Sequence, residues 1–168
     1  MSAITITPKR LAQVQGSIRK LLADFPKPIS TEEDKQRFLS VYHPDVQWSD
    51  HAFLVTRVGH EAILGLHKAW NHCNQPFRVD EKAIVPTPSG AVLEQIWTGR
   101  CANDIVRPSG EMAVKATGKQ YVCHVCMIVE IDEDGLVTKI DEYYNRQWDD
   151  GVAQKDYVVI KGASLKSG

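Results

Sequence analysis

Residues 121–148 read YVCHVCMIVEI, then DEDG, then LVTKIDEYYNRQW, and this stretch decides the fold class. Both arms are rich in β-branched and aromatic residues, which fit a pleated and partly buried surface. The polar run between them ends in Gly135, which can adopt the positive φ that a hairpin turn commonly needs. We therefore predict that Tyr121–Ile131 and Leu136–Trp148 are antiparallel neighbours joined by a turn at 132–135.

The strand pattern continues upstream of this hairpin. Phe77–Val85 and Ala91–Cys101 have a similar composition and are bounded by proline, glycine or aspartate. A shorter run, Val46–Asp50, alternates apolar and polar residues as a strand with one solvated face does. The stretch 102–118 is longer than a hairpin connection needs, so we predict a mobile excursion at the rim of the sheet.

Three helices are predicted in the first half of the chain. The first covers 7–24, because a threonine cap followed by proline begins it and apolar residues recur at helical spacing. A second, shorter helix begins at a Ser30 or Thr31 cap and runs toward Tyr42. A third follows Gly59. Its buried stripe is predicted to hold Ala62, Ile63, Leu66, Ala69 and Trp70, with His60 and His67 on the flank and His72 pointing away.

Helices followed by a meander of long strands are typical of an α+β domain. A sheet with strands this long must twist, so we expect a cone-shaped barrel, in which a strongly curved mixed or antiparallel sheet packs on the three helices. One domain is expected over 1–168, with its core at about 8–150 and a C-terminal extension at 151–168. In that extension, Tyr157–Ile160 is interpreted either as an edge strand or as a dimer contact.

The composition excludes several classes of function. The chain has 43% apolar and 24% charged residues and a formal net charge of −1, so no basic field would gather nucleic acid. No apolar run approaches the roughly 20 residues of a bilayer-spanning helix, so we expect no membrane partner. Four cysteines without a leader-like start predict a reducing, cytoplasmic setting. Cys123 and Cys126 have the spacing of a metal or redox pair, but strand positions three apart point to opposite faces, so we expect no metal site.

Four motifs point to a known family. They are YHPDVQWSD at 42–50, GHEAI at 59–63, DGLV at 134–137 and DEYY at 141–144. In this order the chain resembles the SnoaL-like branch of the nuclear transport factor 2-like superfamily. The resemblance implies the cone-shaped fold and an activity without a cofactor. Ketosteroid isomerases, polyketide cyclases, dehydratases, epoxide hydrolases and non-catalytic binding modules all share this fold. The resemblance therefore predicts the fold but does not select one of these functions.

The resemblance assigns Asp50 to the position of the carboxylate that removes a proton in the isomerases. Met127 stands where those enzymes keep a protonated acid for the oxyanion, and the first helix offers no tyrosine between Pro8 and Pro26 as a second donor. The resemblance therefore argues against a ketosteroid isomerase proper.

Strand alternation places further side chains on one face, which the family analogy makes the inner one. An apolar wall there raises the pKa of a carboxylic acid by disfavouring its charged form, so Glu142 would serve as an acid or a base near neutral pH. The members of this face are Cys123, Val125, Met127, Ile140, Glu142 and Tyr144.

The predicted catalytic set is Asp50, Glu142 and Tyr144, with His67 as a proton partner. Arg57 would close over an acidic group of the substrate. Each residue also has a structural interpretation: a turn cap for Asp50, a cross-strand ion pair for Glu142, packing for the aromatic residues and a solvated loop cation for Arg57. The predicted pocket walls are Trp48, Trp70, Trp97, Cys123, Val125, Met127 and Ile140.

Three functions remain open from the sequence. The first is a cofactor-independent enzyme of polyketide or terpenoid type that isomerises, cyclises or dehydrates a small apolar or polycyclic substrate by general acid/base catalysis, with 102–118 as its lid. The second is a non-catalytic module of the same fold that binds a hydrophobic ligand or serves in dimerisation. The third is an epoxide hydrolase, which would need Asp50, Arg100 and Asp141 to converge. A homodimer is expected through the outer sheet face, which carries His124, Cys126, Ile128 and Tyr143.

Overall fold

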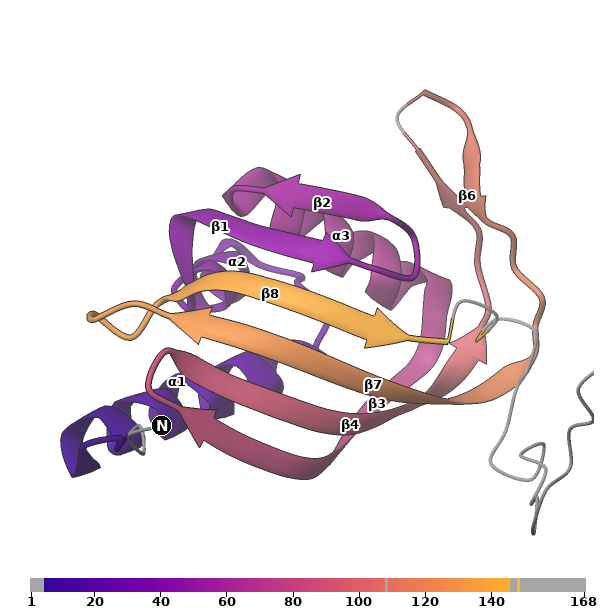
Figure 1. Ribbon diagram of the computed structural model, residues 1–168. Helices are drawn as coiled ribbons and strands as arrows, with labels where there is room; N and C mark the ends of the chain where they lie inside the picture. Colours follow the sequence, from indigo (N-terminus) through magenta and orange to yellow (C-terminus); the bar gives the residue numbers. More distant parts are fainter. Residues whose placement is uncertain (1–4, 108, 146–147, 149–168) are drawn as a thin grey trace, which may run out of the picture.

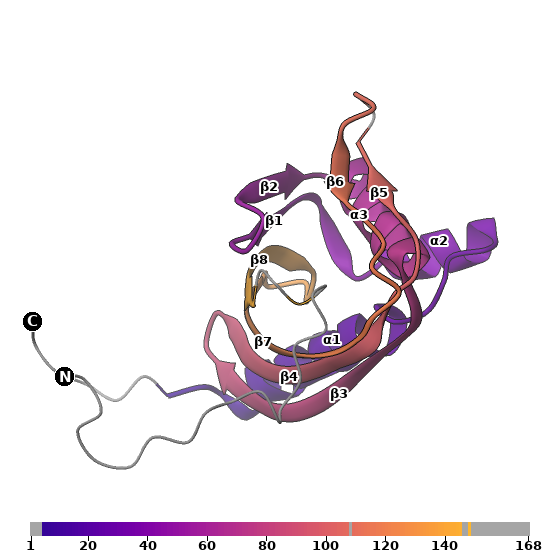
Figure 2. The same cartoon turned by 90° about the vertical axis from the view of Figure 1, so that its right-hand side faces the viewer.

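A curved six-stranded sheet is the main element of the fold, and the helices pack on its concave side (Figures 1 and 2). The computed structural model describes residues 5–107, 109–145 and 148, so the predicted role of Tyr157–Ile160 lies outside the described residues. The strands of this sheet are β1 (Tyr42–Asp50), β2 (Val55–Val58), β3 (Asn74–Thr87), β4 (Gly90–Cys101), β7 (Gln120–Ile131) and β8 (Val137–Tyr144).

The strand order is β2-β1-β8-β7-β4-β3. β1 and β8 run parallel, and the other neighbouring pairs are antiparallel, including the predicted β7–β8 hairpin with Gly135 at φ +87° in its turn. The α+β prediction with a strongly curved mixed sheet is confirmed. The sheet does not close into a barrel, because β2 and β3 remain as its edges.

Three helices cover the concave face, as predicted. Thr7 begins the first one, since its Oγ1 accepts a hydrogen bond from the backbone N–H of Arg10 at 3.2 Å. Thr31, rather than Ser30, caps the second and forms a capping box with Asp34. The helices are α1 (Pro8–Asp24), α2 (Glu32–Leu39) and α3 (His60–Cys73).

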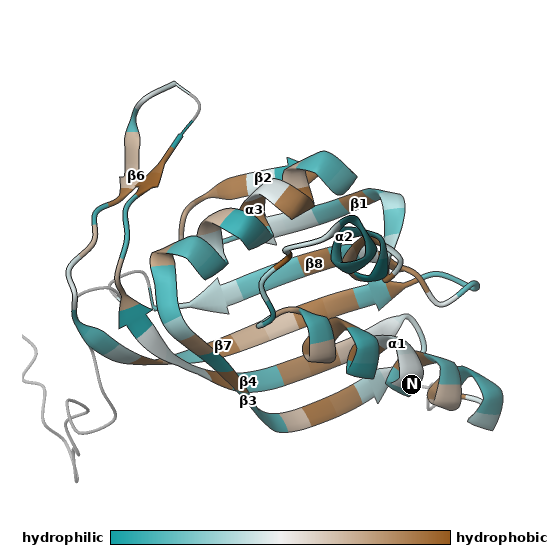
Figure 3. Cartoon of the chain, turned by 180° about the vertical axis from the view of Figure 1, so that it is seen from behind, coloured by the Kyte–Doolittle hydropathy of each residue, from teal (hydrophilic) through white to brown (hydrophobic). Residues whose placement is uncertain are grey.

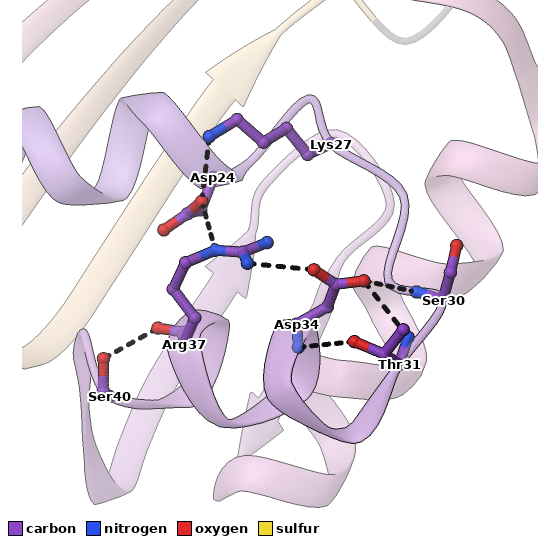
Figure 4. Close-up of polar contacts among 7 residues, drawn as sticks. All are labelled: Asp24, Lys27, Ser30, Thr31, Asp34, Arg37 and Ser40. Atoms are coloured by element: carbon purple, nitrogen blue, oxygen red, sulfur yellow. Dashed lines mark hydrogen bonds and ion pairs between the residues drawn. The ribbon is translucent and has the colours of Figure 1, made fainter.

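An ion-pair network stabilises the connection between α1 and α2 (Figure 4). Arg37 Nε lies 3.0 Å from Asp24 Oδ1, and its Nη1 lies 2.9 Å from Asp34 Oδ1. Phe25 begins this connection, is buried, and stacks on Trp48 with ring centroids 5.6 Å apart. The network therefore helps to hold an aromatic side chain over the inner face of the sheet.

Alternation along β7 and β8 is confirmed. Cys123, Val125 and Met127 are buried on the inner face, whereas Ile128 and Tyr143 lie exposed on the outer one. Figure 3 shows apolar residues, in brown, along the strands beneath the helices. The interior between sheet and helices is thus the hydrophobic core.

The stretch 102–118 contains a small hairpin. β5 (Ile105–Val106) pairs antiparallel with β6 (Met112–Val114), and Gly110 takes φ +85° in the turn between them. The two strands were not predicted, because strands of this length give too few residues for a period-2 pattern. This hairpin projects from the rim of the main sheet (Figure 1).

Gly90 at the start of β4 is required by a close backbone approach. A Cβ atom at this position would lie 1.9 Å from the carbonyl oxygen of Val129. We expect Gly90→Ala to lower the free energy of unfolding by about 1–3 kcal/mol or more, as overpacking does. Gly16→Ala is the matched control, because nothing lies within 4 Å of its added Cβ and alanine favours a helix. Urea denaturation of both variants checks this, and equal stability would contradict it.

Candidate active site

A cavity of about 630 Å³ opens at one end of the inner face, between α3, the β1–β2 turn and the β5–β6 hairpin. Small-molecule sites have volumes of this order and are mostly apolar with a few polar groups. Its charged lining residues are Asp50, Arg57 and Arg107. The apolar walls come from α3 (Ala62, Gly65, Leu66, Ala69 and Trp70), from the hairpin (Ile105, Val106, Ala113 and Val114) and from Phe53 and Val55.

Asp50, the last residue of β1, lies in the cavity wall and is only 4% exposed. Its Oδ1 accepts hydrogen bonds from the backbone N–H groups of Ala52 at 3.1 Å and Phe53 at 2.9 Å. Its Oδ2 accepts one from the hydroxyl of Tyr144 at 3.0 Å and lies 3.9 Å from Arg57 Nη1. Asp50 therefore caps the turn after β1 and also presents a carboxylate to the cavity.

Glu142 is fully enclosed on the inner face of β8, beside Asp50 of β1 in the parallel register. Burial raises its pKa to about 8, and the negative charge of Asp50 adds to the rise. The indole N–H of Trp48 donates to Glu142 Oε2 at 3.1 Å and, with Arg57, offsets part of that rise in pKa. Glu142 is thus mainly a neutral acid at neutral pH.

Tyr144 links the two strands by its hydrogen bond to Asp50. Burial raises the pKa of its phenol, and the charges of Glu142 and Asp50 raise it further. The hydroxyl therefore stays protonated and acts as a donor. The structure brings together Asp50, Tyr144, Arg57, Glu142 and Trp48, all from β1, β2 and β8.

The chain matches the model of the SnoaL-like domain over residues 25–140, more than half of its length. It belongs to the SnoaL-like family. No protein of curated function matches this SnoaL-like chain in sequence. None of its described helices is both long and apolar enough to cross a membrane.

Solved structures similar to this SnoaL-like protein share its fold at low identity. A protein from Xanthomonas campestris described as a proposed polyketide cyclase has 18% identity and a TM-score of 0.62, covering 84% of this chain and 98% of that one. A proposed SnoaL-like polyketide cyclase from Jannaschia sp. has 11% identity and a TM-score of 0.66, covering 86% and 90%. The Δ5-3-ketosteroid isomerase from a Mycobacterium species has 15% identity and a TM-score of 0.54, covering 81% and 95%.

His67 does not lie on the flank of α3, where we expected it. Its ring is 1% exposed and packs against Phe38, with centroids 4.3 Å apart, and against Phe25. Burial lowers its pKa, so a charged imidazole is disfavoured there. Its ring contacts these side chains, Asn71 and the backbone of the α1–α2 connection, and His67 is not among the residues that line the cavity with Asp50.

The predicted pocket walls separate into two groups. Trp70 lines the cavity and contacts Tyr144 with ring centroids 6.2 Å apart. The others are buried in the core, where Trp48 bonds to Glu142 and Trp97 donates to Gln95 Oε1 at 2.7 Å. This core group comprises Trp48, Trp97, Cys123, Val125, Met127 and Ile140.

Two features of the site were not predicted. One is the hairpin wall, signalled only by the short apolar runs on either side of Gly110. The other is the Trp48–Glu142 hydrogen bond, which the inward positions of both residues in alternating strands could have suggested.

The set needed for epoxide hydrolysis is not assembled. Asp141 lies on the outer face, 2.9 Å from Lys139 Nζ and 3.1 Å from His51 Nε2. Arg100 is exposed and donates to the backbone of Gln75. Neither is among the residues that line the cavity with Asp50.

Proposed function

We propose that this SnoaL-like protein is a cofactor-independent enzyme that moves a proton on a small apolar substrate with a carbonyl group. Asp50 removes a proton from carbon, as the first step of an isomerisation, cyclisation or dehydration. The observation that carries the proposal is the position of Asp50, whose carboxylate lies in the wall of an otherwise mainly apolar cavity of about 630 Å³.

The surroundings of Asp50 support this role. A cavity that binds the substrate brings the reacting carbon within reach of the Asp50 carboxylate. Tyr144 orients one carboxylate oxygen, and the buried Glu142 beside Asp50 keeps a proton near neutral pH, so it adds no second full negative charge there. The likeness to proteins described as polyketide cyclases agrees with a small apolar substrate.

One observation favours the alternative of a non-catalytic ligand-binding module. Asp50 accepts three hydrogen bonds, two of them from the turn that follows β1, as a purely structural carboxylate does. In that case the cavity binds its ligand without removing a proton.

A test compound with an acidic C–H bond distinguishes an enzyme that removes a proton from a non-catalytic binding module. 5-Nitrobenzisoxazole loses a carbon-bound proton to a base, its N–O bond breaks, and a coloured phenolate forms. We expect the wild-type protein to convert it with saturation kinetics and faster per carboxylate than acetate in the same buffer. A rate that rises linearly with probe concentration and equals that of acetate would contradict an enzymatic role.

We propose further that two copies associate through the outer sheet face and act in the cytoplasm. Ile128 and Tyr143, at 42% and 43% exposure, are apolar or aromatic neighbours on that face, and covering them would remove apolar surface from water. Light scattering at micromolar concentration tests the association, and a monomer would contradict it.

A further inference from the structure

Arg57 and Trp70 line the cavity with N–H groups that have no hydrogen-bond partner in the described ranges, and Arg57 is the charged one of the two. Its side chain is 24% exposed and extends from β2 into the cavity wall. A guanidinium carries five N–H donors, and that of Arg57 donates no hydrogen bond within the described ranges. Its buried Nη1 comes nearest to Asp50 Oδ2, at 3.9 Å, which is beyond hydrogen-bond distance.

Asp50 does not accept a hydrogen bond from the N–H groups of Arg57. Its two oxygens already accept from Ala52, Phe53 and Tyr144, so Arg57 stands beside the carboxylate rather than bonded to it. Arg107, the other arginine in the cavity wall, differs in this respect, because its Nη1 lies 3.0 Å from Glu111 Oε2. A partly buried guanidinium with unpartnered N–H groups in a cavity wall is placed to bind an oxygen with negative charge.

The separation of base and donor fits one chemical step. In a carbonyl compound, the oxygen and the neighbouring carbon that carries the acidic proton are two bonds apart. A base for that carbon and a donor for that oxygen must therefore stand side by side, at about 3 Å from their own targets. The Asp50 carboxylate and the Arg57 guanidinium stand side by side in this way in the cavity wall, with Oδ2 and Nη1 3.9 Å apart.

We propose that Arg57 is the oxyanion donor of this site. When Asp50 takes the proton, an O–H bond forms on its carboxylate and the C–H bond breaks. The electron pair becomes the C=C bond of an enolate, and the carbonyl oxygen becomes an oxyanion that accepts from Arg57. The substrate class is thus an apolar ketone, ester or related compound with an acidic carbon-bound proton next to the carbonyl.

This assignment rests on the proposed function and explains a departure from the family pattern. Met127, a buried apolar residue, occupies the position assigned to the protonated acid of the isomerases. α1 contains no tyrosine. A donor from β2 replaces both, so the charge of the intermediate is stabilised by a permanent cation rather than by neutral acids.

2-Naphthol tests the assignment without relying on turnover. Its absorbance and fluorescence distinguish the phenol from the phenolate, and the phenolate resembles an enolate in shape and charge. The Asp50→Asn variant mimics the neutral, protonated base, so the bound phenolate meets no negative charge there. In that background we expect the pKa of bound 2-naphthol to fall by about 1–3 pH units relative to free 2-naphthol.

The double variants identify the residue responsible. Adding Arg57→Met to Asp50→Asn should abolish the downward shift, whereas adding Arg57→Lys should retain part of it because the cation remains. Adding Arg78→Met should preserve it, since Arg78 lies on β3 outside the cavity lining and is paired with Asp80. Circular dichroism establishes that each variant is folded.

Three results would overturn the assignment: no saturable binding of 2-naphthol, an unchanged shift without Arg57, or equal loss on replacing Arg78. These outcomes are distinct from failure of the proposed function. A shift that depends on Arg57, combined with no conversion of 5-nitrobenzisoxazole by the wild type, identifies a phenolate-binding site without a base. Conversion without any Arg57-dependent shift leaves the base in place and removes the oxyanion donor.

Discussion

Replacing Asp50 by asparagine is expected to lower the rate of proton removal from 5-nitrobenzisoxazole by about 100-fold or more, which is the range of general base catalysis. An amide cannot take the proton. Its oxygen can still accept from the backbone N–H groups of Ala52 and Phe53, and its other end can still contact the hydroxyl of Tyr144. The fold should therefore persist while the chemistry is lost.

Asp45→Asn is the matched control for this change. Asp45 also lies on β1, but it is exposed and does not line the cavity. Initial rates of phenolate formation, measured over a range of probe concentrations for both variants, separate the two residues. Equal rates for Asp50→Asn and the wild type would remove Asp50 from the mechanism.

Replacing Glu142 by glutamine is expected to change how stability depends on pH. Burial raises the pKa of Glu142 from 4.5 to about 8, so between these values the folded chain keeps a proton that the unfolded chain releases. The contribution of Glu142 to stability is therefore full below about pH 4.5 and is lost as the pH rises toward 8. The slope is at most about 1.4 kcal/mol per pH unit, and the whole effect is on the order of a few kcal/mol.

Glutamine does not titrate, so the variant lacks this decline. We expect the stability of Glu142→Gln relative to the wild type to rise from about pH 5 to about pH 8, whatever constant cost the amide adds. Urea denaturation at both pH values measures it. Glu130→Gln, at an exposed position on β7, is the control that should show no such trend. A parallel pH dependence of wild type and Glu142→Gln would show that Glu142 is already ionised in the fold.

Local signals account for the elements that were predicted correctly. The β7–β8 hairpin is encoded by two β-rich arms around a turn that ends in Gly135, and the starts of α1 and α2 are encoded by threonine caps. Strand alternation also placed Glu142 and Met127 on the inner face. These features need only neighbours in the chain, so the sequence alone reveals them.

His67 shows that the predicted buried stripe of α3 was too narrow. It lies four residues after Ile63 and three before Trp70, so the helical period puts it close to both, and all three are buried. The stripe centred on Ile63 left His67 on its flank, but Phe25 and Phe38 enclose the ring. Tertiary contacts decided the position of this side chain.

The rest of the candidate site depends on pairings between distant segments. Asp50 was reached through the resemblance, but its neighbours follow from the β1–β8 register, which joins residues more than ninety positions apart. The cavity wall depends on how the β5–β6 hairpin approaches α3. Neither arrangement leaves a local pattern in the sequence.

The parallel pairing of β1 with β8 also bears on biosynthesis. Trp48 and Asp50 leave the ribosome long before Glu142 and Tyr144. A nascent chain therefore contains the two β1 residues before their hydrogen-bond partners on β8 have been made. Closing so long a loop costs conformational entropy before its contacts form, which favours slow, late docking of β8. A chain stopped short of residue 142 would therefore be inert as well as unstable.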